Sequence, residues 1–227
     1  MNARIVSKIL LLFTMLIGLL LLTNCNSALE ARSALDTPAM ETTALNIDQF
    51  PVEEVSDEEA AGLIFMREEE KLARDVYKTL YTHWNVRVFN NIPRSEQQHM
   101  NAIKLVLDRY ELEDPVGVDS LGVFQNETLK GLYTSLTSQG SVSLVEALKV
   151  GALIEEIDIL DLQRELDDNV DNQDITFVYQ NLMKGSRNHL RAFVRNLSKR
   201  GVEYTPQKMS EEQYLEIINS DWERGRK

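Results

Sequence analysis

Four segments of this sequence carry carboxylate or imidazole side chains that could bind metal ions, and in three of them two polar residues are three positions apart. Residues three apart lie on the same face of a helix, so Glu96 and His99 can point at one place. Glu155 and Asp158 share this spacing, and so do Ser186 and His189. Carboxylate oxygens and imidazole nitrogens together suit iron or manganese. The spacing therefore indicates a metal site built from several helices.

The polar residues interrupt apolar stripes that would otherwise face a core, where an unpaired charge is costly. The candidate metal ligands are Glu70, Glu96, His99, Glu155, Asp158 and His189. They form a Glu/Glu/His half and a Glu/Asp/His half. A one-residue error in register would exchange Glu155 for Glu156. The opposing hypothesis is a buried polar network in which Glu70 and Glu96 pair with arginines, namely Arg67, Arg74 or Arg187.

Apolar periodicity of three and four residues predicts helices throughout the region that carries these residues. The first spans 56–84 and begins with a capping box, Ser56 with Glu59. The second begins at Pro93 to Ser95 and ends before Pro115. A short helix covers about 127–137, a third long helix starts at Ser143, and a fourth follows a turn near 171–174 and closes at Gly201. A further short helix is expected at about 211–219.

The connection lengths predict the topology. About ten residues join the first two long helices and about six join the last two, which favours two antiparallel hairpins. Some thirty residues separate the hairpins, enough to run the length of a bundle at ~1.5 Å of helix rise per residue. The expected fold is therefore all-α, a four-helix bundle of two antiparallel hairpins joined by a long crossover.

The first 25 residues resemble a bacterial lipoprotein signal. Arg4 and Lys8 precede an apolar stretch, Ile9 to Leu22, that is short for a membrane-spanning helix, and Cys25 follows. The expected domains are a signal at 1–25, a flexible linker at 26–55, the bundle at 56–200 and a tail at 201–227. The resemblance implies an exported protein tethered to the cell envelope through a lipid on Cys25. A plain signal peptide or an uncleaved anchor is the alternative.

The composition argues against nucleic-acid binding and against chemistry that depends on cysteine. The formal net charge of −12 argues against nucleic acid as a partner. Cys25 is the single cysteine, so the folded region has no thiolate for a zinc or iron–sulfur site and no cysteine nucleophile. Self-association is left open by these patterns.

Two motifs resemble the ferritin-like di-iron superfamily. Residues Glu70 to Tyr77 look like the Glu-x-x-Ala-x-x-x-Tyr of a rubrerythrin-type first helix, and Glu96 to His99 is similar to its Glu-x-x-His. The region from about 57 to 200 resembles an uncharacterised prokaryotic ferritin-like family of unknown function, through segments 66–75, 154–159 and 185–190. Ser186 departs from the superfamily pattern, which has a glutamate there, and Asp158 could supply the missing oxygen.

The resemblance implies two bound metal ions, with iron expected and manganese or zinc as alternatives. The expected function is an exported di-metal carboxylate protein that oxidises ferrous iron or reduces peroxide, with oxygen or peroxide as the small-molecule partner. The alternatives are a non-catalytic binding module of the cell envelope and a metal-sequestering protein with a degenerate site. For Tyr77, packing in the core is a commoner role than acting as a redox-active neighbour of a metal.

Overall fold

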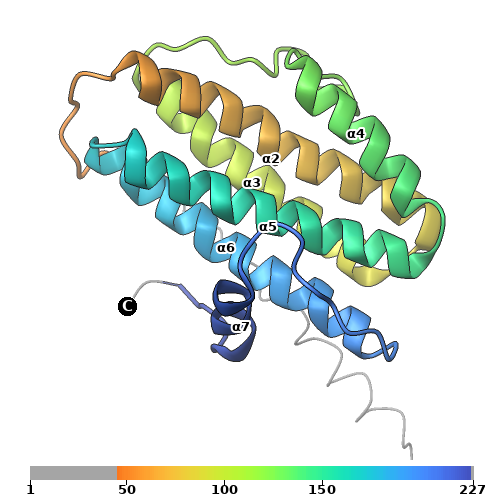
Figure 1. Ribbon diagram of the computed structural model, residues 1–227. Helices are drawn as coiled ribbons and strands as arrows, with labels where there is room; N and C mark the ends of the chain where they lie inside the picture. The colour runs from red at the N-terminus through yellow and green to blue at the C-terminus, as the bar shows by residue number, and fades with distance from the viewer. Residues whose placement is uncertain (1–44, 226–227) are drawn as a thin grey trace, which may run out of the picture. The chain divides into compact units, whose positions relative to one another are not determined.

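The computed structural model describes residues 45–225, and all its regular elements in that range are helices (Figure 1). The helices are α2 (Asp57–Trp84), α3 (Arg87–Arg109), α4 (Glu127–Gly140), α5 (Leu144–Asp168), α6 (Gln173–Ser198) and α7 (Glu211–Asn219). The all-α prediction is confirmed for this part of the chain. The predicted signal at 1–25, its Cys25 and most of the predicted linker lie outside the described residues.

Helix α2 begins where its capping box predicted. The Ser56 side chain accepts a hydrogen bond from the backbone N–H of Glu59 (3.1 Å), and the Glu59 carboxylate accepts one from the backbone N–H of Ser56 (2.9 Å). The helix ends at Asn85, whose φ of 48° is left-handed and whose N–H donates to the Tyr81 carbonyl. Asparagine tolerates this conformation better than most residues, so the chain reverses there within two residues.

Helix α3 starts earlier than the sequence predicted, which corrects the expected start at Pro93 and the expected ten-residue connection. Its first turns bury Val88, Phe89 and Ile92, and Pro93 lies inside the helix. The proline lacks an N–H to donate to the preceding turn. Burial of the three apolar side chains compensates for that loss, since each contributes roughly 1.5–3 kcal/mol. The helix also ends sooner than predicted, at Arg109.

The four long helices enclose the core. Helix α2 packs along α3, and α5 packs along α6, while further contacts join α2 to α5 and α3 to α6 (Figure 1). The segment 110–143 connects the two pairs and carries α4, which lies against α2 and α5. Fully buried side chains from all four helices fill the interior, among them Leu63, Ile103, Leu148 and Leu182. None of the helices in the described range is long and apolar enough to cross a membrane.

Packed structure begins before the predicted domain boundary at residue 56. Ile47 is buried, and the Phe50 ring lies 5.2 Å from the Phe177 ring, centroid to centroid. The Arg109 guanidinium donates to the backbone carbonyls of Ile47 (2.8 Å) and Phe50 (2.7 Å). Residues 45–55 are thus held against the helices, and the expectation of a flexible linker does not describe them.

Two carboxylates fix the C-terminal tail to the helices, and the first of them is fully buried. Glu156 on α5 accepts hydrogen bonds from the Tyr204 hydroxyl (2.5 Å) and from the backbone N–H groups of Gln207 (2.9 Å), Lys208 (2.7 Å) and Met209 (3.0 Å). Further along, Glu223 pairs with Arg187 on α6 (2.5 Å). The predicted short helix in the tail is confirmed as α7, which packs on α6.

Candidate metal centre

Each of the four long helices contributes at least one acid or imidazole to a polar layer inside the core. The side chains of this layer come from α2 (Glu70), α3 (Glu96 and His99), α5 (Glu155 and Asp158) and α6 (Ser186 and His189). All of them are buried, and none is more than 5% exposed. The surrounding aliphatic core makes this layer a region of low polarity, where electrostatic interactions are strong.

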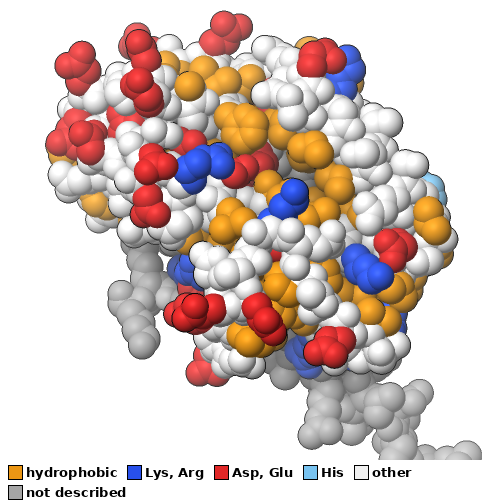
Figure 2. Space-filling model, viewed as in Figure 1, with side chains coloured by type: hydrophobic (Ala, Val, Ile, Leu, Met, Phe, Trp, Pro, Cys, Tyr) orange, Lys and Arg blue, Asp and Glu red, His pale blue; other side chains and the backbone are white. Residues whose placement is uncertain are grey.

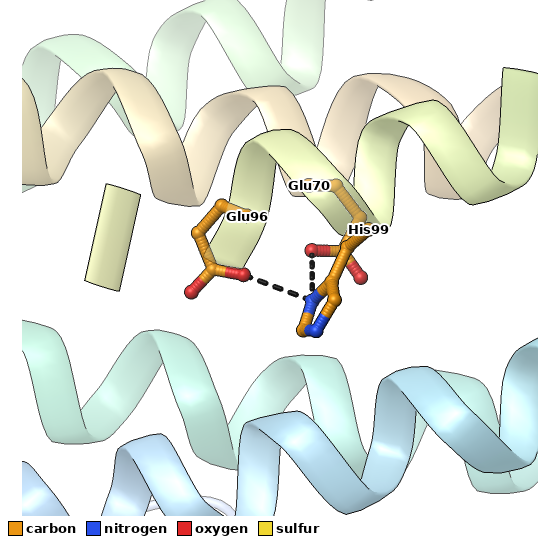
Figure 3. Close-up of side chains that lie close together, drawn as sticks. All are labelled: Glu70, Glu96 and His99. Atoms are coloured by element: carbon orange, nitrogen blue, oxygen red, sulfur yellow. Dashed lines mark hydrogen bonds and ion pairs between the residues drawn. The ribbon is translucent and has the colours of Figure 1, made fainter. Parts of the chain in front are cut away.

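The first group consists of Glu70, Glu96 and His99 (Figure 3). The Nδ1 atom of His99 lies 3.1 Å from Oε2 of Glu70 and 2.9 Å from Oε2 of Glu96. In Figure 3 the two carboxylates approach this nitrogen from different sides. One ligand atom from each residue can be chosen so that all three lie within 4.8 Å of one another.

The second group consists of Glu96, Glu155 and His189. The Nδ1 atom of His189 lies 2.9 Å from Oε1 of Glu96 and 3.4 Å from Oε2 of Glu155. Glu96 therefore takes part in both groups, with one carboxylate oxygen against each histidine. Glu96 is thus the residue that joins the two groups.

Several buried polar atoms of these groups have no hydrogen-bond partner. They are Oε1 of Glu70, Oε1 of Glu96, Nε2 of His99 and Nδ1 of His189. Oε1 of Glu96 and Nδ1 of His189 are close in space but poorly aligned for a hydrogen bond. Buried polar groups are rarely left without a partner. Buried acid and imidazole atoms left without partners in this way suit a bound cation.

The arginines that the polar-network hypothesis paired with these acids are engaged elsewhere. Arg67 forms a bidentate pair with Asp114 (3.1 and 3.0 Å), and Arg74 bonds Asp75 and Asp119. Arg187 pairs with Glu223. The first two pairs instead fasten the crossover segment to α2. The hypothesis is therefore wrong in its choice of partners.

Burial and mutual repulsion shift the pKa values of this layer. Burial acts to raise the pKa of Glu96, but the charges of His189 and His99 outweigh it and lower that pKa to about 2. Burial, together with the charge of Glu96, raises the pKa of Glu155 to about 7. Burial acts to lower the pKa of His189, yet Glu96 and Glu155 raise it to about 10. Burial raises the pKa of Glu70, with His99 opposing.

Asp158 belongs to neither group, although the sequence placed it in one half of the site. Its Oδ2 accepts a hydrogen bond from the hydroxyl of Ser186, and its Oδ1 has no partner. Burial and the nearby charges of Glu70 and Glu155 raise its pKa. The second group instead completes its donor set with Glu96, which spacing along the chain could not reveal.

The structure also separates Glu155 from its neighbour Glu156. Glu155 faces the polar layer, where its Oε1 accepts a hydrogen bond from the Tyr77 hydroxyl at 2.5 Å. Glu156 points to the C-terminal tail. Tyr77 is fully buried and packs against the Phe193 ring, 5.1 Å away between centroids. It thus serves the core and orients a candidate ligand at the same time.

Gly185 is a residue that the sequence did not single out for function. A Cβ atom at this position would lie 2.5 Å from Nε2 of His99. The absence of a side chain on α6 therefore leaves the space that the His99 ring occupies. The identity of residue 185 as a glycine, one position before Ser186, is the only sequence signal for this role.

We expect Gly185→Ala to displace the His99 ring and reduce metal binding at the first group. The Cβ contact is closer than van der Waals packing allows, so either the ring or α6 must move. Metal titration monitored by calorimetry should show at least about a tenfold weaker affinity for one of two ions, equivalent to about 1.4 kcal/mol. Gly131→Ala, where no atom lies within 4 Å of the added Cβ, is the matched control. Unchanged binding in Gly185→Ala would contradict this role.

Metal affinity is expected to rise between pH 6 and 8. His189, with a pKa of about 10, and His99, whose pKa is raised by Glu70 and Glu96 against burial, hold protons in the metal-free protein at neutral pH. A metal ion requires the unprotonated nitrogen, so binding releases protons, and raising the pH favours it. Calorimetry in buffers of different ionisation enthalpy should report roughly one proton released per imidazole. Binding without proton release would show that the histidines are already neutral.

The fold and the site together define an all-helical domain with two buried carboxylate–imidazole groups that share one glutamate. The chain belongs to the family described as "Uncharacterized protein domain (DUF2202)", which matches residues 59–221. The match runs past residue 200, so the family's domain includes most of the docked tail.

A relative from an archaeon extends the comparison. The chain is 56% identical over 179 residues to the uncharacterized protein MJ0754 of Methanocaldococcus jannaschii, which covers 79% of this chain and 96% of that protein. The crystal structure of the hypothetical protein MJ0754 from Methanococcus jannaschii is similar, with a TM-score of 0.75, 56% identity and coverage of 76% of this chain and 98% of that one.

Proposed function

We propose that this protein is a ferritin-like, four-helix-bundle protein that binds two metal ions, with iron as the expected metal. The arrangement of the helices supports the fold: α2 with α3 and α5 with α6 form two pairs, joined through the long segment 110–143. Ferritin-like bundles have one such long crossover and carry their metals between facing helices.

The position of Glu96, with one oxygen against His99 and the other against His189, is the observation that carries the proposal. Glu70 would complete the ligands of one ion, and Glu155 those of the other. Oxygen-rich shells with one imidazole per ion suit iron and manganese, and zinc also accepts such donors. The buried acids outnumber the buried imidazoles, so two divalent cations would offset the excess negative charge.

The proposed activity is oxidation of ferrous iron or reduction of peroxide. Bound iron would supply electrons to a small oxidant at an open coordination position. The protein's own residues exclude bulk water, because every side chain of the polar layer is buried, and Tyr77 holds Glu155 in place. Neither cavity described in the structure, between α5, α6 and the tail or between α2 and α3, contacts the layer. The enclosure favours oxygen or peroxide over any larger substrate.

The proposed location is the cell envelope, through a lipid on Cys25. The basic residues Arg4 and Lys8, the apolar stretch after them and the single cysteine support this proposal. A Cys25→Ser variant should move the protein from the membrane fraction to the soluble exported fraction of the cell.

Elemental analysis of protein purified from iron-replete cells tests the metal proposal. We expect about two ions per chain, and the iron-loaded protein should consume oxygen or peroxide when ferrous iron is added. Metal content below about one-tenth of an equivalent per chain would overturn the proposal, since buried carboxylates and imidazoles of this kind bind tightly when a site is intact.

Metal sequestration without turnover is the second candidate, and the enclosure of the layer favours it. Two ions per chain without consumption of oxygen or peroxide would select this function. A non-catalytic binding module would show neither the metal nor the consumption.

A further inference from the structure

A second set of buried acids lies beside the candidate ligands, between α2 and α5. Glu69 and Asp158 are each 5% exposed, and each has one carboxylate oxygen without a hydrogen-bond partner, Oε2 in Glu69 and Oδ1 in Asp158. Leaving a buried carboxylate oxygen unpaired is costly. These two oxygens are not used by either three-residue group.

The acids form a continuous series from the metal centre outward. Asp158 interacts electrostatically with Glu70 and Glu155, both of which belong to the centre. Glu69 lies among the charges of Asp158, Asp161 and Glu70. Asp158 and Asp161 are three residues apart on one face of α5, and Glu69 on α2 links them to Glu70. These residues alternate between α2 and α5, which are in contact.

The series ends at the protein surface. The Asp161 side chain is 17% exposed, and its Oδ1 lies 2.8 Å from Nη1 of Arg164, whose own side chain is 53% exposed. Acidic side chains crowd the nearby end of the molecule, where α2 begins and α5 ends (Figure 2). They include the exposed Asp57, Glu58, Asp167 and Asp168. Such a surface raises the local concentration of cations.

We propose that Asp161, Glu69 and Asp158 form an access path along which divalent cations move from solvent to the metal centre. The inference rests on the proposed function, because it requires that the centre binds metal. Asp161 captures the ion at the surface, the free oxygens of Glu69 and Asp158 take it in turn, and Glu70 receives it. Arg164 lies at the outer end of the path, where its positive charge opposes the capture of a cation by Asp161.

A purely structural role does not account for these acids. Two buried acids that hold the fold together have partners for both oxygens: Glu156 binds a hydroxyl and several backbone N–H groups, and Asp75 binds Lys71 and Arg74. Glu69 and Asp158 lie instead beside further acids, and each has one carboxylate oxygen that no donor reaches. A path for cations requires this combination of buried acids and uncompensated oxygens.

Stopped-flow loading of the full-length, metal-free protein with cobalt(II) tests the path. Visible absorption of the bound cobalt reports the rate, and the amplitude at equilibrium reports the number of ions per chain. We expect Glu69→Gln and Asp161→Asn to slow loading about tenfold or more, the scale of electrostatic steering of charged ligands. Their final cobalt content should equal that of the wild type. Arg164→Gln should load faster than the wild type.

Asp168→Asn is the matched control, an exposed acid on the same helix that lies outside the path. It should slow loading by less than about twofold, because it is one of several acids at that end and lies outside the path. The path would be overturned if Glu69→Gln and Asp161→Asn load as fast as Asp168→Asn while the wild type binds two ions. A wild type that binds no cobalt would overturn the proposed function itself, together with the path. Thermal melting of each variant checks that it is folded.

Discussion

Glu96→Gln is expected to abolish binding at both metal positions, lowering the metal content from about two ions per chain to near zero. Glu96 is the one residue common to both groups, with its two oxygens 2.9 Å from the Nδ1 atoms of His99 and His189. An amide offers one neutral oxygen and one nitrogen that repels a cation. The Glu96→Gln variant should therefore lose the ions of both groups together.

Glu70→Gln distinguishes this outcome from general damage to the core. Glu70 belongs to the first group alone, so this variant should retain the ion held by Glu155 and His189. Elemental analysis and calorimetry would measure both variants. The bridging role of Glu96 would be refuted if Glu96→Gln and Glu70→Gln each lose the same single ion.

The neighbours Glu155 and Glu156 should give opposite results when each is changed to glutamine. Glu156→Gln is expected to destabilise the fold by about 3 kcal/mol, because charge-assisted hydrogen bonds to the tail weaken and buried N–H groups lose partners. Its metal content should not change. Glu155→Gln should lose one metal ion, and the metal-free form should unfold at the same temperature as the wild type or higher, since a repelled buried charge is removed.

Thermal and denaturant unfolding of the metal-free proteins, with metal content measured in parallel, checks this pair. The two positions differ by one residue on the same helix, so each variant is the control for the other. Loss of metal in Glu156→Gln with an intact fold would reverse the assignment of the two residues.

Local signals in the sequence predicted much of the helical structure. The capping box at Ser56 and Glu59 depends only on residues three apart, so the start of α2 was predictable. The start of α3 was not, because Pro93 resembles a helix start. The helix extends before it only because Val88, Phe89 and Ile92 find a buried surface on other helices. That surface exists only in the folded protein.

The candidate site was likewise predictable from the sequence only where it depends on residues close together in the chain. Spacing of three residues placed Glu96 with His99, and the structure brings them together. It could not show that Glu96 also reaches His189, since that distance depends on how α3 and α6 pack. For the same reason spacing assigned Asp158 to the second half, whereas its contacts are with Ser186 and the series that includes Glu69. The role of Gly185 required the position of the His99 ring.

The two-residue connection at Asn85 determines the relative heights of Glu70 on α2 and His99 on α3. Glu70 lies fifteen residues before Asn85 and His99 lies fourteen residues after it, so both sit at nearly equal heights above the turn. A residue inserted into either helix between the turn and the ligand would shift that ligand by ~1.5 Å along the axis and rotate it by more than a quarter-turn. The distance of 3.1 Å between Glu70 and His99 could not survive that shift. The number of residues between the turn and each candidate ligand is therefore under the same constraint as the ligands themselves.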